Sequence, residues 1–423
     1  MNYKQSLDFI HSRMKFGSCP GMERIEALCN AFDNPQDKLK FVHVAGTNGK
    51  GSTCNMISSI LVSAGYNVGL FTSPYIEDFR ERIQFNSQMI AQSELAEIIT
   101  DIQPVVENLS KKGIEPTEFE IITVAAFLYF LKRKCDIVVL EVGLGGKLDS
   151  TNIIKQSEVS VICSISMDHT DVLGDTLLKI AEQKCGIFKE NGKVVSYPQP
   201  DFSVERFIKE KAKQMNCEYT PSELSKIKII RDEIDGPTIL YAGLTFKIPL
   251  TGKHQIYNFS TAIAAINVLK MNGWVITQKN MIDGIQSVHM PARVEIINKS
   301  PLTVIDGGHN VEGIDALCHC LKKYCSDKKI IAVFGMMKDK EYMEAIKKLM
   351  PLCSKVYATT SSNPRSIPAK ELAKDIKPYN SKVKAIDEPA KAYEKALKKA
   401  GEKDMVLVCG SLYLASDVKK LQK

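Results

Sequence analysis

Short apolar runs alternate with amphipathic stretches from residue 41 onward. The runs are rich in Val and Ile, which is typical of strands buried on both faces of a parallel sheet. They lie at residues 41–45, 68–72, 136–142, 159–166 and 193–197. Because helix-like segments fill the intervals between them, the pattern predicts an α/β fold in which helices cover a mostly parallel sheet.

The same pattern locates two helices and one less regular portion. Residues 53–64 place their apolar side chains on one face, and Gly65 follows as a typical C-terminal cap. Residues 200–250 alternate less clearly and carry Pro, Gly and charge, so we expect an irregular or antiparallel portion there. An Ala-rich helix at residues 256–269 follows it.

A second alternating series predicts a second α/β domain. Its strands are expected at residues 302–306, 329–334, 355–360 and 405–409. One hydrophobic core stops growing at roughly 250–300 residues, and the chain has 423. Because the stretch 291–301 is rich in turn residues, we expect an N-terminal domain at 1–295 and a C-terminal Rossmann-like domain at 296–423.

The composition is typical of a globular enzyme. Hydrophobic residues make up 44% and charged residues 25% of the chain, and no apolar run approaches the roughly 18–20 residues of a membrane-spanning helix. The N-terminus lacks a basic segment followed by an apolar stretch, so we expect a cytoplasmic protein. The net charge of +7 is dispersed, without a basic tract that interleaves with aromatic residues, which favours anionic small molecules over nucleic acid.

A glycine-rich loop, GTNGKGS at residues 46–52, follows the first strand and precedes the first helix. In this setting backbone N–H groups turn toward an anion, and the helix N-terminus adds partial positive charge. We therefore expect a P-loop ATPase domain whose phosphate contacts come from Asn48, Gly49, Lys50, Gly51 and Ser52. The loop departs from the common pattern because a glycine separates the lysine from the serine. The plainer alternative is a tight strand-to-helix connection.

Three polar residues lie at the carboxyl ends of predicted strands, where open α/β sheets bind their ligands. They are Ser73, Glu141 and His169. A hydroxyl, a carboxylate and an imidazole that converge there predict a magnesium site beside the ATP phosphates. Taken singly, Ser73 reads as a turn residue before Pro74, and His169 reads as a helix-start residue.

Together with further motifs, these segments resemble folylpolyglutamate synthases and dihydrofolate synthases of the Mur ligase superfamily. The resemblance covers nearly the whole chain. The motifs that carry it stand in the family's order at residues 46–52, 72–75, 141–152, 168–174, 183–187, 291–293, 306–310, 339–340 and 410–413. The chain departs from the family at Lys147, Ala292 and Gln183, where arginine, glycine and glutamate are common.

The resemblance implies a magnesium and ATP site that uses both domains. Two magnesium ions would be held by Ser73, Glu141 and His169. Nucleotide contacts beyond the glycine loop are implied for Asn258, Arg293, Asp306 and His309.

The local sequence pattern and the resemblance predict different roles for Lys184. On a predicted helix at residues 177–185, a lysine is typically a solvated surface charge. The resemblance implies instead a carbamylated lysine, in which CO2 adds to the neutral amine and creates an anion that assists magnesium. We expect Lys184 to act in catalysis together with Lys50 and His169.

A pterin-bearing substrate is also implied by the resemblance. Its contacts would come from a helix start and a loop, at Thr117, Glu118, Phe119, Glu120, Leu148, Asp149 and Ser150. Phe119 can stack on the pterin ring, and Asp149 can accept hydrogen bonds from pterin N–H groups. Without the resemblance, both segments read as ordinary structure.

Amide formation from a free carboxylate and an amine in water is unfavourable, so the carboxylate must first be activated by ATP. We expect a monomeric ATP-dependent ligase that adds L-glutamate to folates, and also to dihydropteroate, through an acyl phosphate. One alternative is another Mur-type ligase that acts on a peptidoglycan precursor. A second is a non-catalytic protein that binds nucleotide.

Overall fold

The computed structural model describes residues 1–16, 21–338 and 342–422. The family motif at residues 339–340 lies outside the described residues. Contacts divide the chain into two compact units. Unit 1 comprises Met1–Tyr75, Phe79–Ile227 and Tyr257–Ser287, and unit 2 comprises Ile76–Asp78, Lys228–Ile256 and Val288–Lys423. The division expected between residues 295 and 296 stays a prediction.

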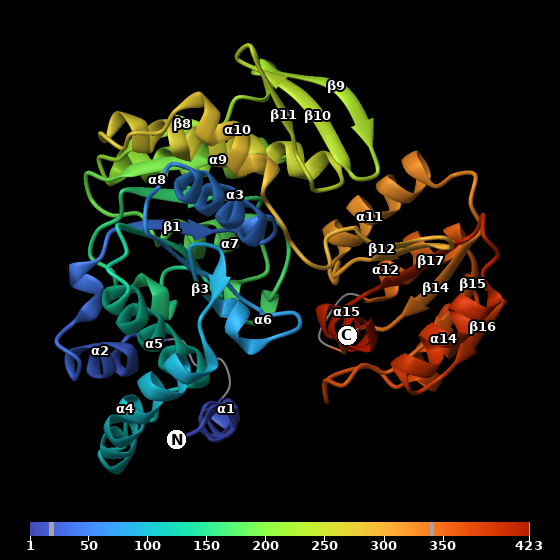
Figure 1. The fold of residues 1–423 in the computed structure, drawn as a ribbon, viewed down its shortest axis with the longest axis horizontal. Coiled ribbons are helices and arrows are strands. Elements are labelled where there is room, and N and C mark those ends of the chain that lie inside the picture. Colours follow the sequence, from blue (N-terminus) through green and yellow to red (C-terminus); the bar gives the residue numbers. More distant parts are fainter. Residues whose placement is uncertain (17–20, 339–341, 423) are drawn as a thin grey trace. The chain divides into compact units, whose positions relative to one another are not determined.

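The sheet of unit 1 has the strand order β4-β3-β2-β5-β1-β6-β7-β8 (Figure 1). Its strands are β1 Phe41–Ala45, β2 Val68–Phe71, β3 Ile83–Phe85, β4 Gln88–Met89, β5 Ile137–Glu141, β6 Val159–Ile162, β7 Lys193–Ser196 and β8 Glu218–Pro221. β1 pairs in parallel with β5 and β6, whereas β3 is antiparallel to β2 and β4. All residues of β1, β2, β5 and β6 are buried. The predicted α/β class with a mostly parallel sheet is confirmed.

The helices of the N-terminal part are α1 Tyr3–Ser12, α2 Glu23–Asn30, α3 Lys50–Ser63, α4 Gln92–Lys111, α5 Glu118–Lys132, α6 Thr170–Leu173, α7 Leu177–Cys185, α8 Phe202–Gln214, α9 Lys253–Met271 and α10 Gln278–Gln286. Figure 1 shows α3 and α10 on one side of β1 and α5 on the other. On the α5 side, the rings of Phe127 and Phe41 meet edge-on at 5.7 Å. Within the described residues, no helix has both the length and the apolarity needed to cross a membrane.

Three details differ from the sequence expectation for physical reasons. β6 ends at Ile162 rather than at residue 166, because Ser164 O accepts a hydrogen bond from Thr47 N at 2.7 Å and so joins the glycine loop. α3 already begins at Lys50, so the end of that loop is its first turn. Within residues 200–250, the antiparallel portion is confirmed by β10 (Gly236–Tyr241) and β11 (Leu244–Lys247), but helix α8 was not expected.

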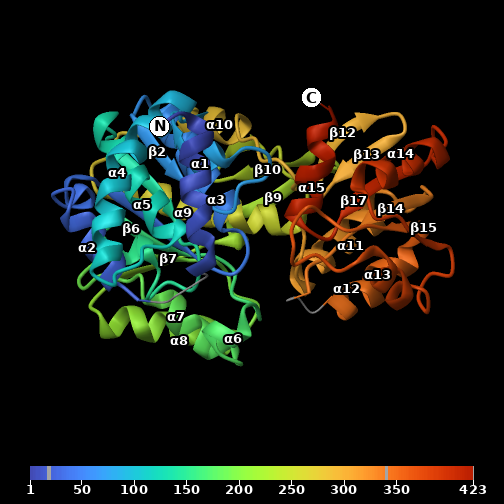
Figure 2. The same cartoon turned by 90° about the horizontal axis from the view of Figure 1, so that it is seen from below.

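Unit 2 contains a sheet of strand order β12-β13-β17-β14-β15-β16 and a smaller one of order β11-β10-β9. The remaining elements are β9 Ile227–Glu233, β12 Glu295–Lys299, β13 Leu302–Ile305, β14 Ile330–Phe334, β15 Cys353–Ala358, β16 Val383–Ala385, β17 Met405–Cys409, α11 Val311–Tyr324, α12 Tyr342–Leu349, α13 Ala369–Ile376, α14 Pro389–Lys399 and α15 Leu412–Lys419. Figure 2 shows α11, α12 and α13 on one side of the larger sheet and α14 with α15 on the other. Because β13, β14, β15, β16 and β17 pair in parallel, the Rossmann-like expectation for this part is confirmed.

Candidate functional site

The glycine loop joins β1 to α3 in a conformation that favours glycine. Gly49 is the N-cap of α3 with φ of 82°, and among the described residues no side chain caps the first turn. A Cβ at Gly49 would lie only 2.3 Å from Asn258 Oδ1 on α9. The backbone N–H groups of the first turn are therefore not capped by a side chain, which is the arrangement that binds phosphate at helix N-termini.

The segment that follows β6 holds this loop from one side. Thr47 N donates to Ser164 O at 2.7 Å, and Thr47 Oγ1 donates to Ser166 O at 3.1 Å. Asn48 Nδ2 reaches Ser166 Oγ at 3.3 Å. Ser164 and Ser166 lie beyond the end of β6 and not within the strand expected at residues 159–166, so this contact was not predicted. Their position directly after a central strand was the available signal, since loops at that end of a parallel sheet converge.

Two lysines donate to carbonyl groups of the loop. Lys50 Nζ lies 3.2 Å from Thr47 O, and Lys184 Nζ lies 2.8 Å from Gly46 O. Lys184 is only 3% exposed, so the local interpretation of a solvated surface lysine is wrong. Burial, reinforced by the positive charge of Lys50, lowers the pKa of Lys184 to about 7. A substantial fraction of this amine is therefore neutral near pH 7.

The expected metal residues are partly brought together. Glu141 ends β5, is 3% exposed, and accepts a hydrogen bond from Ser73 N at 3.1 Å through Oε2. His169 is the N-cap of α6, and its Nε2 lies 3.9 Å from the carboxylate of Asp168. In the part of the chain that the structure describes, no three His, Cys, Asp or Glu side chains form a metal-binding group. Mg²⁺ commonly takes one or two carboxylates and completes its shell with water and substrate phosphates, so this donor set fits an ion that binds with ATP.

The start of α5 is fixed by ion pairs and a capping box. Thr117 is the N-cap, and its N–H donates to Glu120 Oε2 at 2.7 Å. Glu120 is also paired with Arg24 at 2.9 Å, and Glu118 is paired with His11 at 3.1 Å. Both expected substrate-contacting carboxylates thus have a structural partner, and their contact with a pterin stays a prediction.

Phe119 and the loop after β5 form one packed surface. A Cβ at Gly143 would lie 2.5 Å from Phe119 Cζ, so the ring rests directly on the loop backbone. In that loop Leu148 is 46% exposed, whereas Asp149 and Ser150 are buried. The structure therefore offers an aromatic ring and an exposed apolar side chain, as a flat heterocycle requires. The pterin contacts of these residues stay predictions.

Unit 2 brings together three of the residues expected to bind nucleotide. Asp306 follows β13, accepts hydrogen bonds from Val294 N at 3.0 Å and Gly308 N at 2.8 Å, and is 7% exposed. Burial raises the pKa of Asp306, and the charge of Arg293 opposes that shift. His309 Nδ1 lies 3.0 Å from Gly307 O. This cluster lies at the carboxyl end of β13, where the fold binds ligands. Asn258 belongs to unit 1, on α9.

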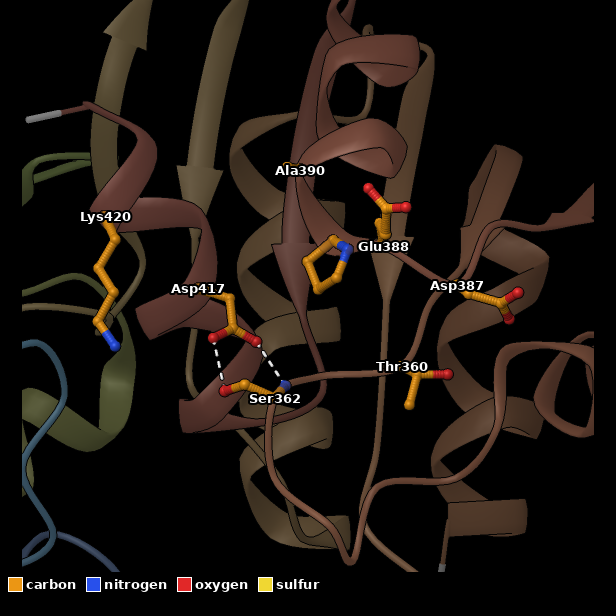
Figure 3. Close-up of a pocket in the computed structure, with 8 residues that line it drawn as sticks. Thr360, Ser362, Asp387, Glu388, Ala390, Asp417 and Lys420 are labelled. Atoms are coloured by element: carbon orange, nitrogen blue, oxygen red, sulfur yellow. Dashed lines mark hydrogen bonds between the residues drawn. The ribbon is translucent and has the colours of Figure 1, made fainter.

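A pocket of about 360 Å³ opens elsewhere in unit 2, near the ends of β15 and β16 (Figure 3). The described residues that line it are Thr360, Ser362, Asp387, Glu388, Pro389, Ala390, Asp417 and Lys420. Asp417 holds one wall by accepting hydrogen bonds from the Ser362 N–H at 2.8 Å and from the Ser362 hydroxyl at 2.7 Å. None of these lining residues belongs to the predicted site.

Comparisons with known proteins agree along the whole chain. The Mur ligase middle domain matches residues 44–266, and the Mur ligase glutamate ligase domain matches residues 292–412. The chain is 36% identical to a dihydrofolate synthase/folylpolyglutamate synthase of Bacillus subtilis, over 100% of this chain and 99% of that protein. It is 33% identical to a folylpolyglutamate synthase of Lacticaseibacillus casei, over 99% and 98% of the two chains.

The fold also matches that of a solved structure along the whole chain. The structure of E. coli FolC in complex with DHPP and ADP matches with a TM-score of 0.88 and 28% identity, over 100% of this chain and 98% of that one. By sequence and by fold, the chain belongs to the folylpolyglutamate synthase and dihydrofolate synthase family of Mur ligases.

Proposed function

We propose that this chain is an ATP-dependent ligase that adds L-glutamate to the carboxylate of folates and to that of dihydropteroate. The observation that carries the proposal is the conformation of the glycine loop. Gly49 begins α3 without a side-chain cap, in a space that a Cβ would fill, so the first helical turn presents its N–H groups to an anion. The relatives support the substrate class, because the Bacillus subtilis protein is named for both activities.

The loop residues Asn48, Gly49, Lys50, Gly51 and Ser52 bind the ATP phosphates in this proposal. Further nucleotide contacts come from Asn258, Arg293, Asp306 and His309. The γ-phosphoryl group is transferred to an oxygen of the substrate carboxylate, which gives an acyl phosphate and ADP. The glutamate amine then attacks the acyl carbon, loses a proton, and inorganic phosphate leaves. Lys50 offsets the charge that develops on the transferred group.

Ser73, Glu141 and His169 would hold magnesium, with Glu141 as the buried carboxylate. The ions supply charge neutralisation for the phosphates. In this proposal Lys184 is carbamylated, which is supported by the burial of its amine and by a pKa that is lowered to about 7. The neutral amine attacks CO2, forms a carbamate and releases one proton. The resulting anion lies next to the glycine loop, since Lys184 Nζ is 2.8 Å from Gly46 O.

The pterin-bearing part of the substrate lies against Phe119 and Leu148 in this proposal. Phe119 supplies a ring face, and Asp149 and Ser150 supply polar groups at the edge of the same surface. Thr117, Glu118 and Glu120 complete it at the start of α5. The charges of Glu118 and Glu120 are already balanced by Arg82 and Arg24, so they shape the pocket more than they attract a cation.

The proposal is tested by ADP release with ATP, Mg²⁺ and L-glutamate, while the acceptor is varied. The acceptors are dihydropteroate, tetrahydrofolate, a peptidoglycan precursor, or none. Glutamate-dependent turnover with both pterins supports two activities, and turnover with tetrahydrofolate alone restricts the chain to one. Turnover with the peptidoglycan precursor alone supports the other Mur-type ligase, and nucleotide binding without any turnover supports a binding protein.

The acyl phosphate is tested with an acceptor whose carboxylate carries ¹⁸O. Transfer through that intermediate places one ¹⁸O in the released phosphate, which mass spectrometry detects. Lys50→Met should lower turnover by about 10²-fold or more, as loss of a charge-stabilising donor does. Lys132→Met is the matched control, because Lys132 is 47% exposed and paired with Glu97 on the surface. Phosphate without the label would contradict the acyl phosphate.

A further inference from the structure

A buried histidine in the central strand of unit 1 has no part in the activity described so far. His43 lies in the middle of β1 and is 0% exposed. Its Nε2 lies 2.9 Å from Thr151 Oγ1. Within the described residues, its Nδ1 has no hydrogen-bond partner. A buried imidazole in which only one of the two nitrogens forms a hydrogen bond is uncommon and requires a physical explanation.

Thr151 connects this ring to a carboxylate of the proposed pterin site. Thr151 Oγ1 lies 2.5 Å from Asp149 Oδ1, and Thr151 N donates to the same oxygen at 3.0 Å. Asp149 Oδ2 accepts a hydrogen bond from Leu144 N at 2.8 Å. The carboxylate therefore holds both ends of the loop after β5, and the ring of Phe119 rests on Gly143 in that same loop.

The positions of the protons in the contacts of His43 with Thr151 and of Thr151 with Asp149 can be assigned by elimination. Burial, reinforced by the charge of Lys189, lowers the pKa of His43 to about 3, so the ring is neutral and carries one proton. If Nδ1 carried that proton, a buried N–H would have no acceptor among the described residues. The proton is therefore on Nε2, which donates to Thr151. A hydroxyl has a single proton, so Thr151 donates it to Asp149.

We propose that His43 is a positioning residue for pterin recognition, which acts through Thr151 on the carboxylate of Asp149 and on the loop from Gly143 to Ser150. The proposal rests on the proposed function, because it concerns the pterin subsite. Thr151 Oγ1 accepts the Nε2–H of His43 through one of its lone pairs, and its hydroxyl proton is thereby directed to Asp149. Asp149 then remains an acceptor of hydrogen bonds, and pterin N–H groups are the ligands that such an acceptor selects.

The structure offers a matched control on the neighbouring strand. Ser160 of β6 is the parallel partner of His43 in the sheet and is 1% exposed. Its hydroxyl lies 3.2 Å from Ile187 O and 3.1 Å from Ser157 Oγ, so these contacts involve neither Thr151 nor Asp149. Ser160→Ala thus removes a buried hydroxyl from the same sheet without touching the contact to Thr151.

The test compares wild type, His43→Leu, His43→Gln and Ser160→Ala by steady-state kinetics with dihydropteroate, ATP, Mg²⁺ and glutamate. His43→Leu should raise the KM for dihydropteroate about tenfold, the range expected when one hydrogen bond is lost. The KM values for ATP and glutamate should stay within about twofold, because those sites keep their contacts. His43→Gln should restore the pterin KM, since its amide also carries an N–H donor, and Ser160→Ala should behave as wild type.

A second measurement needs no substitution. In ¹⁵N NMR of the wild-type protein with labelled histidine, the His43 ring should show a protonated Nε2 and an unprotonated Nδ1. A proton on Nδ1 would overturn the assignment. An unchanged pterin KM in His43→Leu, or equal loss in Ser160→Ala, would overturn the positioning role. If wild type itself turns over no pterin, the proposed function fails, and that result is distinct because it precedes any comparison of variants.

Discussion

Gly49→Ala adds one methyl group at the N-cap of α3, where the backbone has φ of 82°. An ideal Cβ at that position lies 2.3 Å from Asn258 Oδ1 and 3.1 Å from Asn258 Cγ. Atoms do not approach so closely in folded proteins, so one of the two residues must move. Asn258 is only 1% exposed, and its side chain is enclosed by protein on α9. The methyl group therefore has to displace either the start of α3 or a buried side chain.

The cost has two separable parts. A left-handed conformation costs an L-residue about 1–2 kcal/mol relative to glycine. An extra group forced into a packed interior costs about 1–3 kcal/mol more. We therefore expect Gly49→Ala to lower the free energy of unfolding by about 2–5 kcal/mol. The same displacement moves the first-turn N–H groups, so the affinity for ADP should fall about tenfold or more.

Gly65→Ala separates the two parts, because Gly65 follows the other end of α3 with φ of 88°. In the described part of the chain, no neighbouring heavy atom lies within 4 Å of a Cβ added there. This control carries the conformational cost alone, about 1–2 kcal/mol, and should leave ADP binding unchanged. Urea unfolding measures stability, and isothermal titration calorimetry measures ADP binding. Equal stability of the two variants, or wild-type ADP affinity in Gly49→Ala, would refute the close contact with Asn258 as the cause.

Three further outcomes follow from charged side chains in unit 1. The pKa of Lys184 is lowered from 10.5 to about 7 in the folded protein. Between these two pH values the unfolded chain binds one more proton at this residue than the folded chain, so the contribution of Lys184 to the free energy of unfolding rises with pH across that window. Lys184→Met should remove that rise, as measured by urea unfolding. Glu141→Gln should reduce kcat/KM by about 10²–10³-fold and weaken the response to added Mg²⁺, measured by Mg²⁺ titration of turnover. Glu120→Gln leaves Arg24 without its carboxylate and should cost about 3–5 kcal/mol, whereas Lys132→Met, at an exposed ion pair, should cost at most about 1 kcal/mol by the same unfolding assay.

The strands whose bounds were predicted most accurately are buried along their whole length. The bounds expected for β1 and β17 are those that the structure shows, because each is a short, fully buried and mostly apolar run between a charged residue and a glycine. β6 was predicted too long, since Cys163 and Ile165 continue its apolar pattern although Ser164 leaves the ladder to bind Thr47. A tertiary hydrogen bond ended this strand, and its local sequence does not encode that contact.

In the candidate site, too, features that depend on local sequence could be predicted, whereas features that depend on tertiary packing could not. Glycine conformation is a local property, so the loop that contains Gly49 could be placed before a helix from the sequence alone, although that helix begins at Lys50 and not at residue 53 as expected. The burial of Lys184 depends on how α7 packs against the glycine loop, and its helical pattern gives no sign of it. His43 was counted only as part of an apolar strand, because its partner Thr151 is more than a hundred residues away in the chain.

The glycine loop and Lys184 depend on each other electrostatically. Lys50 and Lys184 each donate to a carbonyl oxygen of the same loop, at Thr47 and Gly46. The charge of Lys50 also lowers the pKa of Lys184, so the lysine proposed to bind phosphate is one that keeps its neighbour partly neutral. A lysine in water at pH 7 is almost entirely protonated, and it is this buried position next to Lys50 that gives Lys184 the free amine that the proposed carbamylation requires.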